Sequence, residues 1–138
     1  MSQQETFIEQ PAAKAALISV LIVDDNPLLL KLGRALLSSL NCSVTTASTW
    51  IELSESLKSV TPDIIFMDVN LQSVKGNRLA EVLKSQTRTR NIPIILMSDM
   101  PEKDIEALVP GCGANGWFQK PLTRERVSKA LRQIQAAN

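Results

Sequence analysis

Short runs of apolar residues alternate along the chain with longer segments whose apolar residues recur at helical spacing, beginning at Ile18. Short apolar runs rich in valine and isoleucine are typical of strands that are buried on both faces. Such runs predict five strands, at residues 19–23, 43–47, 64–69, 93–98 and 116–119. Because strands and helices alternate strictly, we expect an α/β fold: a doubly wound five-stranded parallel sheet with helices on both faces.

Capping residues mark where three of the helices begin. Asn26 has the side chain of an N-cap, and Pro27 suits the first helical position, where no backbone N–H is needed. Thr49 and Thr123 are the predicted caps of two further helices, because a threonine hydroxyl can accept a bond from the first turn. These signals place helices directly after the first, second and fifth strands.

The other two helices are predicted at residues 76–84 and 102–109, and Pro110 is expected to end the second of them. Apolar residues that recur at helical spacing are expected to face the core. These inward positions are Leu29, Leu32, Gly33, Leu36, Leu40, Ile51, Leu53, Leu57, Val60, Leu79, Val82, Leu83, Val127, Ala130, Leu131 and Ile134.

Residues 1–17 are predicted to form a polar tail, with a short helix over residues 12–16, and residues 18–138 to form one domain. The N-terminus lacks the pattern of a signal peptide, and no apolar run approaches the roughly 20 residues needed to span a bilayer. We therefore expect a cytoplasmic protein without membrane contact. Cys42 and Cys112 are then expected to be free thiols, because cytoplasmic thiols are normally kept reduced.

Composition supports a globular domain and disfavours nucleic acid as a partner. Apolar residues make up 44% and charged residues 21% of the chain, which is an ordinary balance for a protein with a packed core. The net charge is only +1 and aromatic residues are 4%, so neither a strong basic field nor a stacking platform is expected. We expect no direct nucleic-acid binding by this chain.

Polar residues close four of the five predicted strands. Asp24 and Asp25 follow the first strand, Asp68 closes the third, Ser98 the fourth, and Lys120 follows the fifth. Singly, each is most often a turn former, a helix cap or a solvated charge. Because the carboxyl ends of parallel strands share one edge of a sheet, the fold would bring all of them together.

Carboxylates crowded at one edge repel one another unless a cation is present. Mg²⁺ prefers oxygen ligands and usually combines one or two protein carboxylates with water and phosphate. Lys120 adds a positive charge suited to a phosphoryl oxygen, and Ser98 adds a hydroxyl donor. A carboxylate nucleophile beside such groups is typical of a site that accepts a phosphoryl group as an aspartyl phosphate.

Three segments resemble the response-regulator receiver domain of two-component signalling systems, and the resemblance covers about residues 18–136. They read VLIVDD at residues 20–25, PDIIFMD at 62–68 and GANGWFQKP at 113–121. The resemblance implies the flavodoxin-like strand order 2-1-3-4-5. It also implies a signalling module rather than an enzyme, which catalyses only its own phosphorylation and dephosphorylation. The implied partners are a sensor histidine kinase or a histidine phosphotransfer protein as donor, and a downstream output protein or domain.

The resemblance also implies roles for individual residues. Asp68 is the implied phosphoacceptor, with Ser98 and Lys120 binding the phosphoryl oxygens. The implied Mg²⁺ ligands are Asp24, Asp25, Asp68 and the backbone carbonyl of Asn70. Ser98 and Trp117 are the implied switch pair, and the peptide bond before Pro121 is expected to be cis.

The chain departs from the usual receiver pattern at a few positions near this site. Gln72 stands where the family commonly has proline, Asp99 where it has a small residue, and Trp117 where it has tyrosine or phenylalanine. Asp99 is expected to repel small anionic phosphodonors. Leu28 and Leu30 flank the inward Leu29 and are candidate residues of a docking patch for the donor protein.

One other function, the pseudo-receiver, remains as an alternative, and two further ones fit the sequence poorly. A pseudo-receiver would use the same fold as an interaction module without phosphorylation; Asp99 and Trp117 favour it, whereas the complete acidic site disfavours it. A small phosphatase with an aspartyl nucleophile would need a second aspartate where the chain has Asn70. A flavin-binding protein is disfavoured because the carboxylates of Asp24 and Asp25 would repel its phosphate.

Overall fold

The computed structural model describes residues 17–137. The tail predicted up to residue 17, apart from Leu17 itself, and the short helix predicted over residues 12–16 lie outside the described residues.

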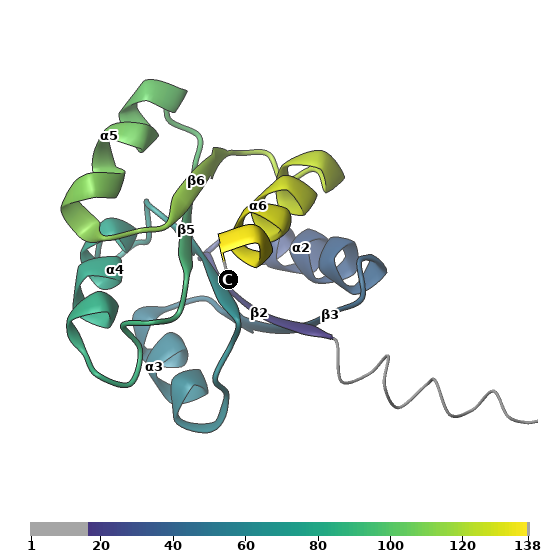
Figure 1. Ribbon diagram of the computed structural model, residues 1–138, viewed down its shortest axis with the longest axis horizontal. Helices are drawn as coiled ribbons and strands as arrows, with labels where there is room; N and C mark the ends of the chain where they lie inside the picture. Colours follow the sequence, from purple (N-terminus) through teal and green to yellow (C-terminus); the bar gives the residue numbers. More distant parts are fainter. Residues whose placement is uncertain (1–16, 138) are drawn as a thin grey trace, which may run out of the picture.

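A single parallel sheet forms the middle layer of the molecule, as the alternating pattern predicts (Figure 1). The strands lie in the order β3-β2-β4-β5-β6. Counted along the chain this order is 2-1-3-4-5, which confirms the predicted doubly wound topology. Their bounds are β2 Ile18–Val23, β3 Cys42–Ala47, β4 Ile64–Asp68, β5 Ile94–Ser98 and β6 Gly116–Gln119. Strand ends thus differ from the predicted ones by at most one residue.

Helices cover both faces of the sheet. Their bounds are α2 Pro27–Ser39, α3 Trp50–Ser59, α4 Gly76–Ser85, α5 Glu102–Cys112 and α6 Arg124–Ala137. Figure 1 shows α2 and α6 on one face and α3, α4 and α5 on the other. The central strands β4 and β5 are buried along their whole length, as strands covered on both sides must be.

Two apolar clusters, one on each face of the sheet, form the core. Phe66 and Ile22 belong to the cluster beneath α2 and α6, and Leu21 and Ile65 belong to the cluster beneath α3, α4 and α5. Burial of each such side chain stabilises the fold by roughly 1.5–3 kcal/mol. A rigid sheet held in this way fixes the positions of the residues at its strand ends.

The predicted helix caps are confirmed. The Asn26 side chain accepts hydrogen bonds from the amides of the first turn of α2, and the Thr49 hydroxyl accepts one from Glu52 in α3. The Thr123 hydroxyl accepts a bond from the amide of Arg126 at the start of α6. Local capping signals were therefore sufficient to place these helix starts.

The predicted end of α5 is wrong. The helix does not stop before Pro110 but contains it and continues to Cys112. Pro110 costs the helix the one backbone hydrogen bond that its missing N–H would donate, and the last turn nevertheless continues beyond it to Cys112. The helix instead ends at Gly113, whose φ of 78° is the left-handed conformation that favours glycine at a helix C-terminus.

Three predicted inward positions are also wrong. Leu32, Ile51 and Val82 have exposed fractions of 51%, 59% and 49%. Each lies at the edge of an apolar helix face that is narrower than the sequence pattern predicts. Leu37 on α2 and Ala80 on α4 are buried instead. The other predicted inward positions are buried or half-buried. Cys42 and Cys112 are buried free thiols, as predicted.

Among residues 17–137, the helices are too short or too polar for any of them to cross a membrane.

Candidate functional site

The candidate site lies at the carboxyl edge of the sheet, at the ends of β2 and β4. Between these two strands the order of the strands in the sheet changes direction. Strand β2 pairs with β3 on one side and β4 on the other, and this arrangement places Asp24 beside Asp68, since Val23 pairs with Met67. On the other side of β4, Asp68 pairs with Met97, which precedes Ser98. The polar residues that close the strands are therefore neighbours across the sheet, as the sequence predicted.

Lys120 joins two buried carboxylates at this edge. Its Nζ donates a hydrogen bond to Asp68 Oδ1 at 3.0 Å and lies 2.7 Å from Asp24 Oδ2. Asp24 and Asp68 are buried, and the Lys120 side chain is only 11% exposed. Low solvent access makes these charge interactions stronger than those of a surface ion pair.

The environment changes the proton affinities of two of these groups. Burial raises the pKa of Asp68, and the neighbouring charge of Asp24 raises it further, whereas Lys120 and the Asn70 amide lower it by a smaller amount. Burial alone would lower the pKa of Lys120, but the two carboxylates outweigh burial and raise that pKa above its ordinary value. The protonated form of Lys120 is thus favoured, whereas ionisation of Asp68 costs free energy in the folded state.

The acidic residues fit a divalent cation. Asp24, Asp25 and Asp68 offer carboxylate oxygens that all lie within 4.8 Å of one another. Asp24 Oδ1 accepts a hydrogen bond from the Asn26 amide at 2.9 Å, but the buried Oδ2 accepts none from the described residues. Lys120 Nζ forms an ion pair with Oδ2 at 2.7 Å, but its single positive charge does not balance three carboxylates. A buried acceptor in a three-carboxylate cluster favours a hard cation such as Mg²⁺.

Backbone contacts fix the loops around the site. The amide of Lys120 donates to the Ser98 carbonyl at 2.8 Å, and the amide of Gly76 donates to the Val69 carbonyl at 2.8 Å. A Cβ atom at position 76 would overlap the main-chain oxygen of Asp68. Glycine is therefore required here, because the loop between β4 and α4 passes directly against the strand end.

Ser98 and Asn70 lie at the same edge. Ser98 is buried, and its hydroxyl oxygen accepts a hydrogen bond from the amide of Met100 at 3.1 Å. This bond leaves the hydroxyl hydrogen free to be donated elsewhere. Asn70 stands two residues beyond Asp68, in the exposed part of the loop after β4.

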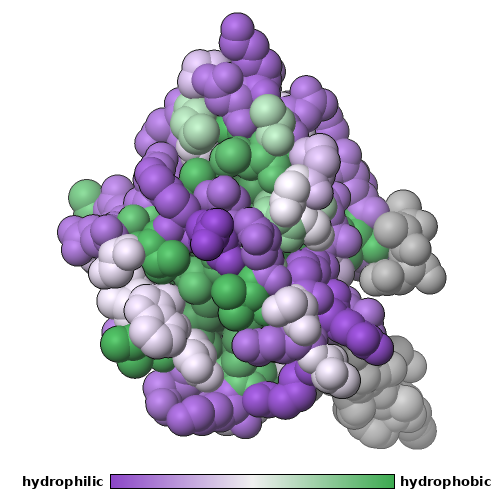
Figure 2. Space-filling model, turned by 90° about the vertical axis from the view of Figure 1, so that its left-hand side faces the viewer, coloured by the Kyte–Doolittle hydropathy of each residue, from purple (hydrophilic) through white to green (hydrophobic). Residues whose placement is uncertain are grey.

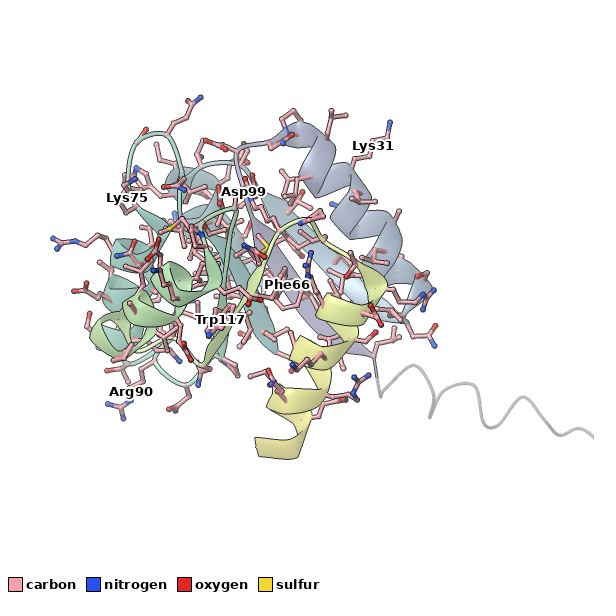
Figure 3. The ribbon with its side chains drawn as sticks, turned by 90° about the horizontal axis from the view of Figure 1, so that it is seen from above. Lys31, Phe66, Lys75, Arg90, Asp99 and Trp117 are labelled. Carbon is pink, nitrogen blue, oxygen red and sulfur yellow. The ribbon has the colours of Figure 1, made fainter. Side chains whose placement is uncertain are left out.

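Charged side chains surround the opening of the site, and one of their contacts was not predicted. Seen from above, Asp99 lies between the loop that carries Lys75 and helix α2 (Figure 3). Asp99 is exposed. Lys75 Nζ donates a hydrogen bond to Asn70 Oδ1 at 2.9 Å, a contact for which the sequence gives no signal, because it depends on how the loop turns.

Trp117 lies on β6, beside the site rather than in it. It pairs with Leu96 on β5, so its side chain points to the same face of the sheet as Ser98, two residues further along β5. The indole is half-buried and packs against the cluster beneath α5. The Lys120–Pro121 peptide bond is cis.

Known proteins resemble this chain in sequence and structure. The family model for the response regulator receiver domain matches residues 20–132. The polar-differentiation response regulator DivK of Brucella ovis is 28% identical over 114 residues, which are 83% of this chain and 93% of DivK.

Two solved structures show the same fold. The chemotaxis response regulator CheY4 of Vibrio cholerae superposes with a TM-score of 0.79 at 24% identity, covering 86% of this chain and 99% of CheY4. The receiver domain of the sensor histidine kinase PA1611 from Pseudomonas aeruginosa has a TM-score of 0.76 at 27% identity. The match covers 87% of this chain and 99% of that receiver domain. That receiver was crystallised with a magnesium ion coordinated in its active site cleft. The match over most of the chain, together with the fold and the strand-end residues, shows that this protein belongs to the response regulator receiver domain family.

Proposed function

We propose that this chain accepts a phosphoryl group on Asp68 and thereby acts as the switchable component of a two-component phosphorelay. The observation that carries the proposal is the pairing of Asp68 with Lys120 at 3.0 Å, inside a cluster of three carboxylates. Residues 18–138 would form the receiver domain. The donor would be a sensor histidine kinase or a histidine phosphotransfer protein, and phosphorylation would alter a surface that binds an output partner.

In the proposed reaction an oxygen of the ionised Asp68 carboxylate attacks the phosphorus of a phosphohistidine. The new O–P bond forms as the P–N bond breaks, and the departing imidazole nitrogen keeps the electron pair. Lys120, already paired with the acceptor, would stabilise the negative charge on the phosphoryl oxygens, and the Ser98 hydroxyl would donate a hydrogen bond to another oxygen. Asp68 must be ionised to attack, so its raised pKa predicts that the rate falls on acidification.

Mg²⁺ would be held by Asp24, Asp25 and Asp68, with the Asn70 backbone carbonyl as a further ligand. When bound, Mg²⁺ neutralises the carboxylate cluster and the charge of the incoming phosphoryl group. This neutralisation would offset the repulsion that raises the pKa of Asp68. The chain's own contribution is to fix the acidic groups at one strand edge before the ion or the donor arrives.

A shallow apolar surface beside the site is suited to the donor protein. A hollow of about 280 Å³ is lined by Leu28, Leu29, Leu32 and Pro121, together with Asp99 and Lys120 of the site region. Leu28 is 75% exposed, whereas Leu30 is half-buried and packs against the core. We assign the docking patch to Leu28 and Leu32, because their α2 stripe adjoins the entrance to Asp68.

Intact-mass measurement after incubation with Mg²⁺ and acetyl phosphate tests the proposed function. The wild-type chain is expected to gain one phosphoryl group, and the gain is expected to disappear when Mg²⁺ is removed with EDTA. An unmodified mass in both samples, with phosphotransfer from histidine kinases also absent, would instead support the pseudo-receiver alternative.

Asp25→Ala is expected to weaken Mg²⁺ binding and to slow phosphorylation. The half-buried Asp25 carboxylate belongs to the cluster, and Mg²⁺ surrounded mostly by water binds weakly to a single remaining protein carboxylate. Isothermal titration of the wild-type and variant proteins with Mg²⁺ measures the change, with the exposed Asp63→Ala as the control. An Mg²⁺ affinity equal to that of the wild type would remove Asp25 from the set of ligands.

A further inference from the structure

A second hollow, the α3–α4 groove, lies away from the phosphoryl site. It has a volume of about 200 Å³ and is lined by apolar side chains of both helices, among them Trp50, Leu57, Leu79 and Val82. Figure 2 views the side of the molecule that bears α3, α4 and α5 and shows hydrophobic residues gathered in a band across it. The groove is not explained by phosphoryl transfer, because none of the site residues lines it.

The groove leaves two large apolar side chains in water. Trp50 is 48% exposed and Val82 is 49% exposed, and they lie on opposite walls of the same hollow. A scattered exposed leucine is ordinary, but exposed apolar residues that converge on a groove are typical of a binding surface. The groove therefore favours an occupant with its own apolar side chains.

The charged residues that line the groove are both cations. They are Lys58 and Arg88, and no acidic residue among the described ones lines it. Arg88 Nη2 donates a hydrogen bond to the Leu57 carbonyl at 2.6 Å, which holds the guanidinium against the end of α3. Lys58 pairs with Glu55 at 2.9 Å, but both side chains are 65% exposed, so this pair is weak and exchangeable. An occupant with acidic residues beside its apolar ones would complement this rim.

The described chain begins at the same edge of the sheet as the loop that follows α3. The amide of Ser19 donates to the Asp63 carboxylate at 2.8 Å, and the amide of Asp63 donates to the Ser19 carbonyl at 2.8 Å. Asp63 follows α3 by only four residues, since the helix ends at Ser59. Residues 1–16 are therefore attached at the edge of the sheet where α3 ends, and Leu57 and Lys58 of that last turn line the groove.

We propose that the α3–α4 groove binds residues 5–9 of this same chain, Glu-Thr-Phe-Ile-Glu. Phe7 and Ile8 supply adjacent apolar side chains, and Glu5 and Glu9 flank them with the charge that complements Lys58 and Arg88. The seven residues between Glu9 and Leu17 can span up to about 25 Å, whereas the ten-residue helix α3 is about 15 Å long. The linker can therefore extend farther than the length of α3.

Fluorescence of Trp50 tests this binding in the full chain. Trp117→Phe makes Trp50 the sole tryptophan, because the sequence contains only these two. In that background, Phe7→Ala with Ile8→Ala is expected to shift the emission of Trp50 to the red and to increase its quenching by acrylamide. Glu5→Gln with Glu9→Gln is expected to act in the same direction, most clearly at low salt, where charge interactions are least screened.

A second measurement identifies the surface that the segment occupies. A labelled synthetic peptide of residues 1–16 is added to the Phe7→Ala, Ile8→Ala protein, and its binding is followed by fluorescence anisotropy. Val82→Glu in this host is expected to weaken binding, because it places a negative charge in the groove. Ile51→Glu is the matched control: Ile51 on α3 is also exposed, at 59% against 49% for Val82, but it does not line the groove, so binding should not change.

Two results would overturn the proposal. One is equal emission and quenching of Trp50 with the native and the substituted segment. The other is shielding of Trp50 that depends on protein concentration and coincides with a dimer in sedimentation, which would assign the groove to a second copy of the chain. Neither measurement involves Asp68 or a phosphodonor, so failure here leaves the proposed phosphorylation untouched, and the reverse also holds.

Discussion

The Asp68→Asn protein is expected to gain no phosphoryl group under conditions in which the wild-type chain gains one. An amide oxygen at this position is a far poorer nucleophile than a carboxylate oxygen, and the substitution also removes one of the three acidic groups that would hold Mg²⁺. Intact-mass measurement after incubation with Mg²⁺ and acetyl phosphate reports the loss directly. Asp99→Asn is the matched control, because Asp99 lies at the exposed rim, and this variant should still be labelled.

The same substitution is expected to stabilise the protein in the absence of Mg²⁺. Burial and Asp24 raise the pKa of Asp68 in the folded state. The contribution of Asp68 to stability is therefore fully present only below the pKa that this carboxyl group has in the unfolded chain. That contribution is lost as the pH rises through the raised pKa of the folded state. At neutral pH the ionised Asp68 therefore opposes folding, and Asp68→Asn should raise the melting temperature of the Mg²⁺-free protein.

These two effects together separate a functional role from a structural one. A variant that is more stable yet unlabelled has lost the acceptor and not the fold. Labelling of the Asp68→Asn protein would place the phosphoacceptor elsewhere. A lower melting temperature without Mg²⁺ would mean that the bond to Lys120 outweighs the burial of Asp68.

The sequence predicted the fold and the site for the same physical reason. The valine- and isoleucine-rich runs are buried as strands covered on both faces, and four of the five runs are closed by a polar residue that cannot be buried without a partner. The positions of Asp24, Asp68 and Ser98 follow from these strand ends alone. Their mutual distances then follow from the parallel sheet.

Features that depend on the width of a helix face or on loop geometry were not predictable. Leu32 and Val82 have the spacing of inward residues, but whether a marginal position is covered depends on how closely the neighbouring helix approaches. Pro110 was expected to end α5, although Gly113 does so, because the loss of one backbone hydrogen bond was not enough to end the helix. The bond between Lys75 and Asn70 and the α3–α4 groove are likewise products of tertiary packing.

Lys120→Met is expected to have the largest effect on stability among the site variants. It leaves the buried carboxylates of Asp24 and Asp68 without their cation, and removal of one partner from a buried ion pair costs about 3 kcal/mol. The methionine side chain keeps much of the volume of the lysine stem, so the loss reports charge rather than a cavity. Chemical denaturation without Mg²⁺ measures the change in the free energy of unfolding.

The pH dependence of this loss identifies its electrostatic origin. In the wild type the pKa of Lys120 is raised above its ordinary value of 10.5, so its contribution is fully present below that value and is lost only as the pH rises through the raised pKa. In Lys120→Met the uncompensated carboxylates resist ionisation, and the destabilisation should shrink as acidification protonates them. A loss that is constant between neutral and acidic pH would instead indicate a packing defect.

Mg²⁺ is expected to replace part of what Lys120 supplies. A ligand present at 100 times its dissociation constant stabilises the folded state by about 2.7 kcal/mol, which is close to the expected loss, so Mg²⁺ should restore most of the stability of Lys120→Met. It should not restore the rate of phosphorylation, because the cation that contacts the phosphoryl oxygens is still missing. Lys75→Met is the control: Lys75 is an exposed lysine at the same edge that contacts Asn70 rather than a buried carboxylate, so its loss should change stability by less than about 1 kcal/mol. If Mg²⁺ stabilises Lys120→Met no more than it stabilises the wild type, the carboxylate cluster and Lys120 do not share one electrostatic site.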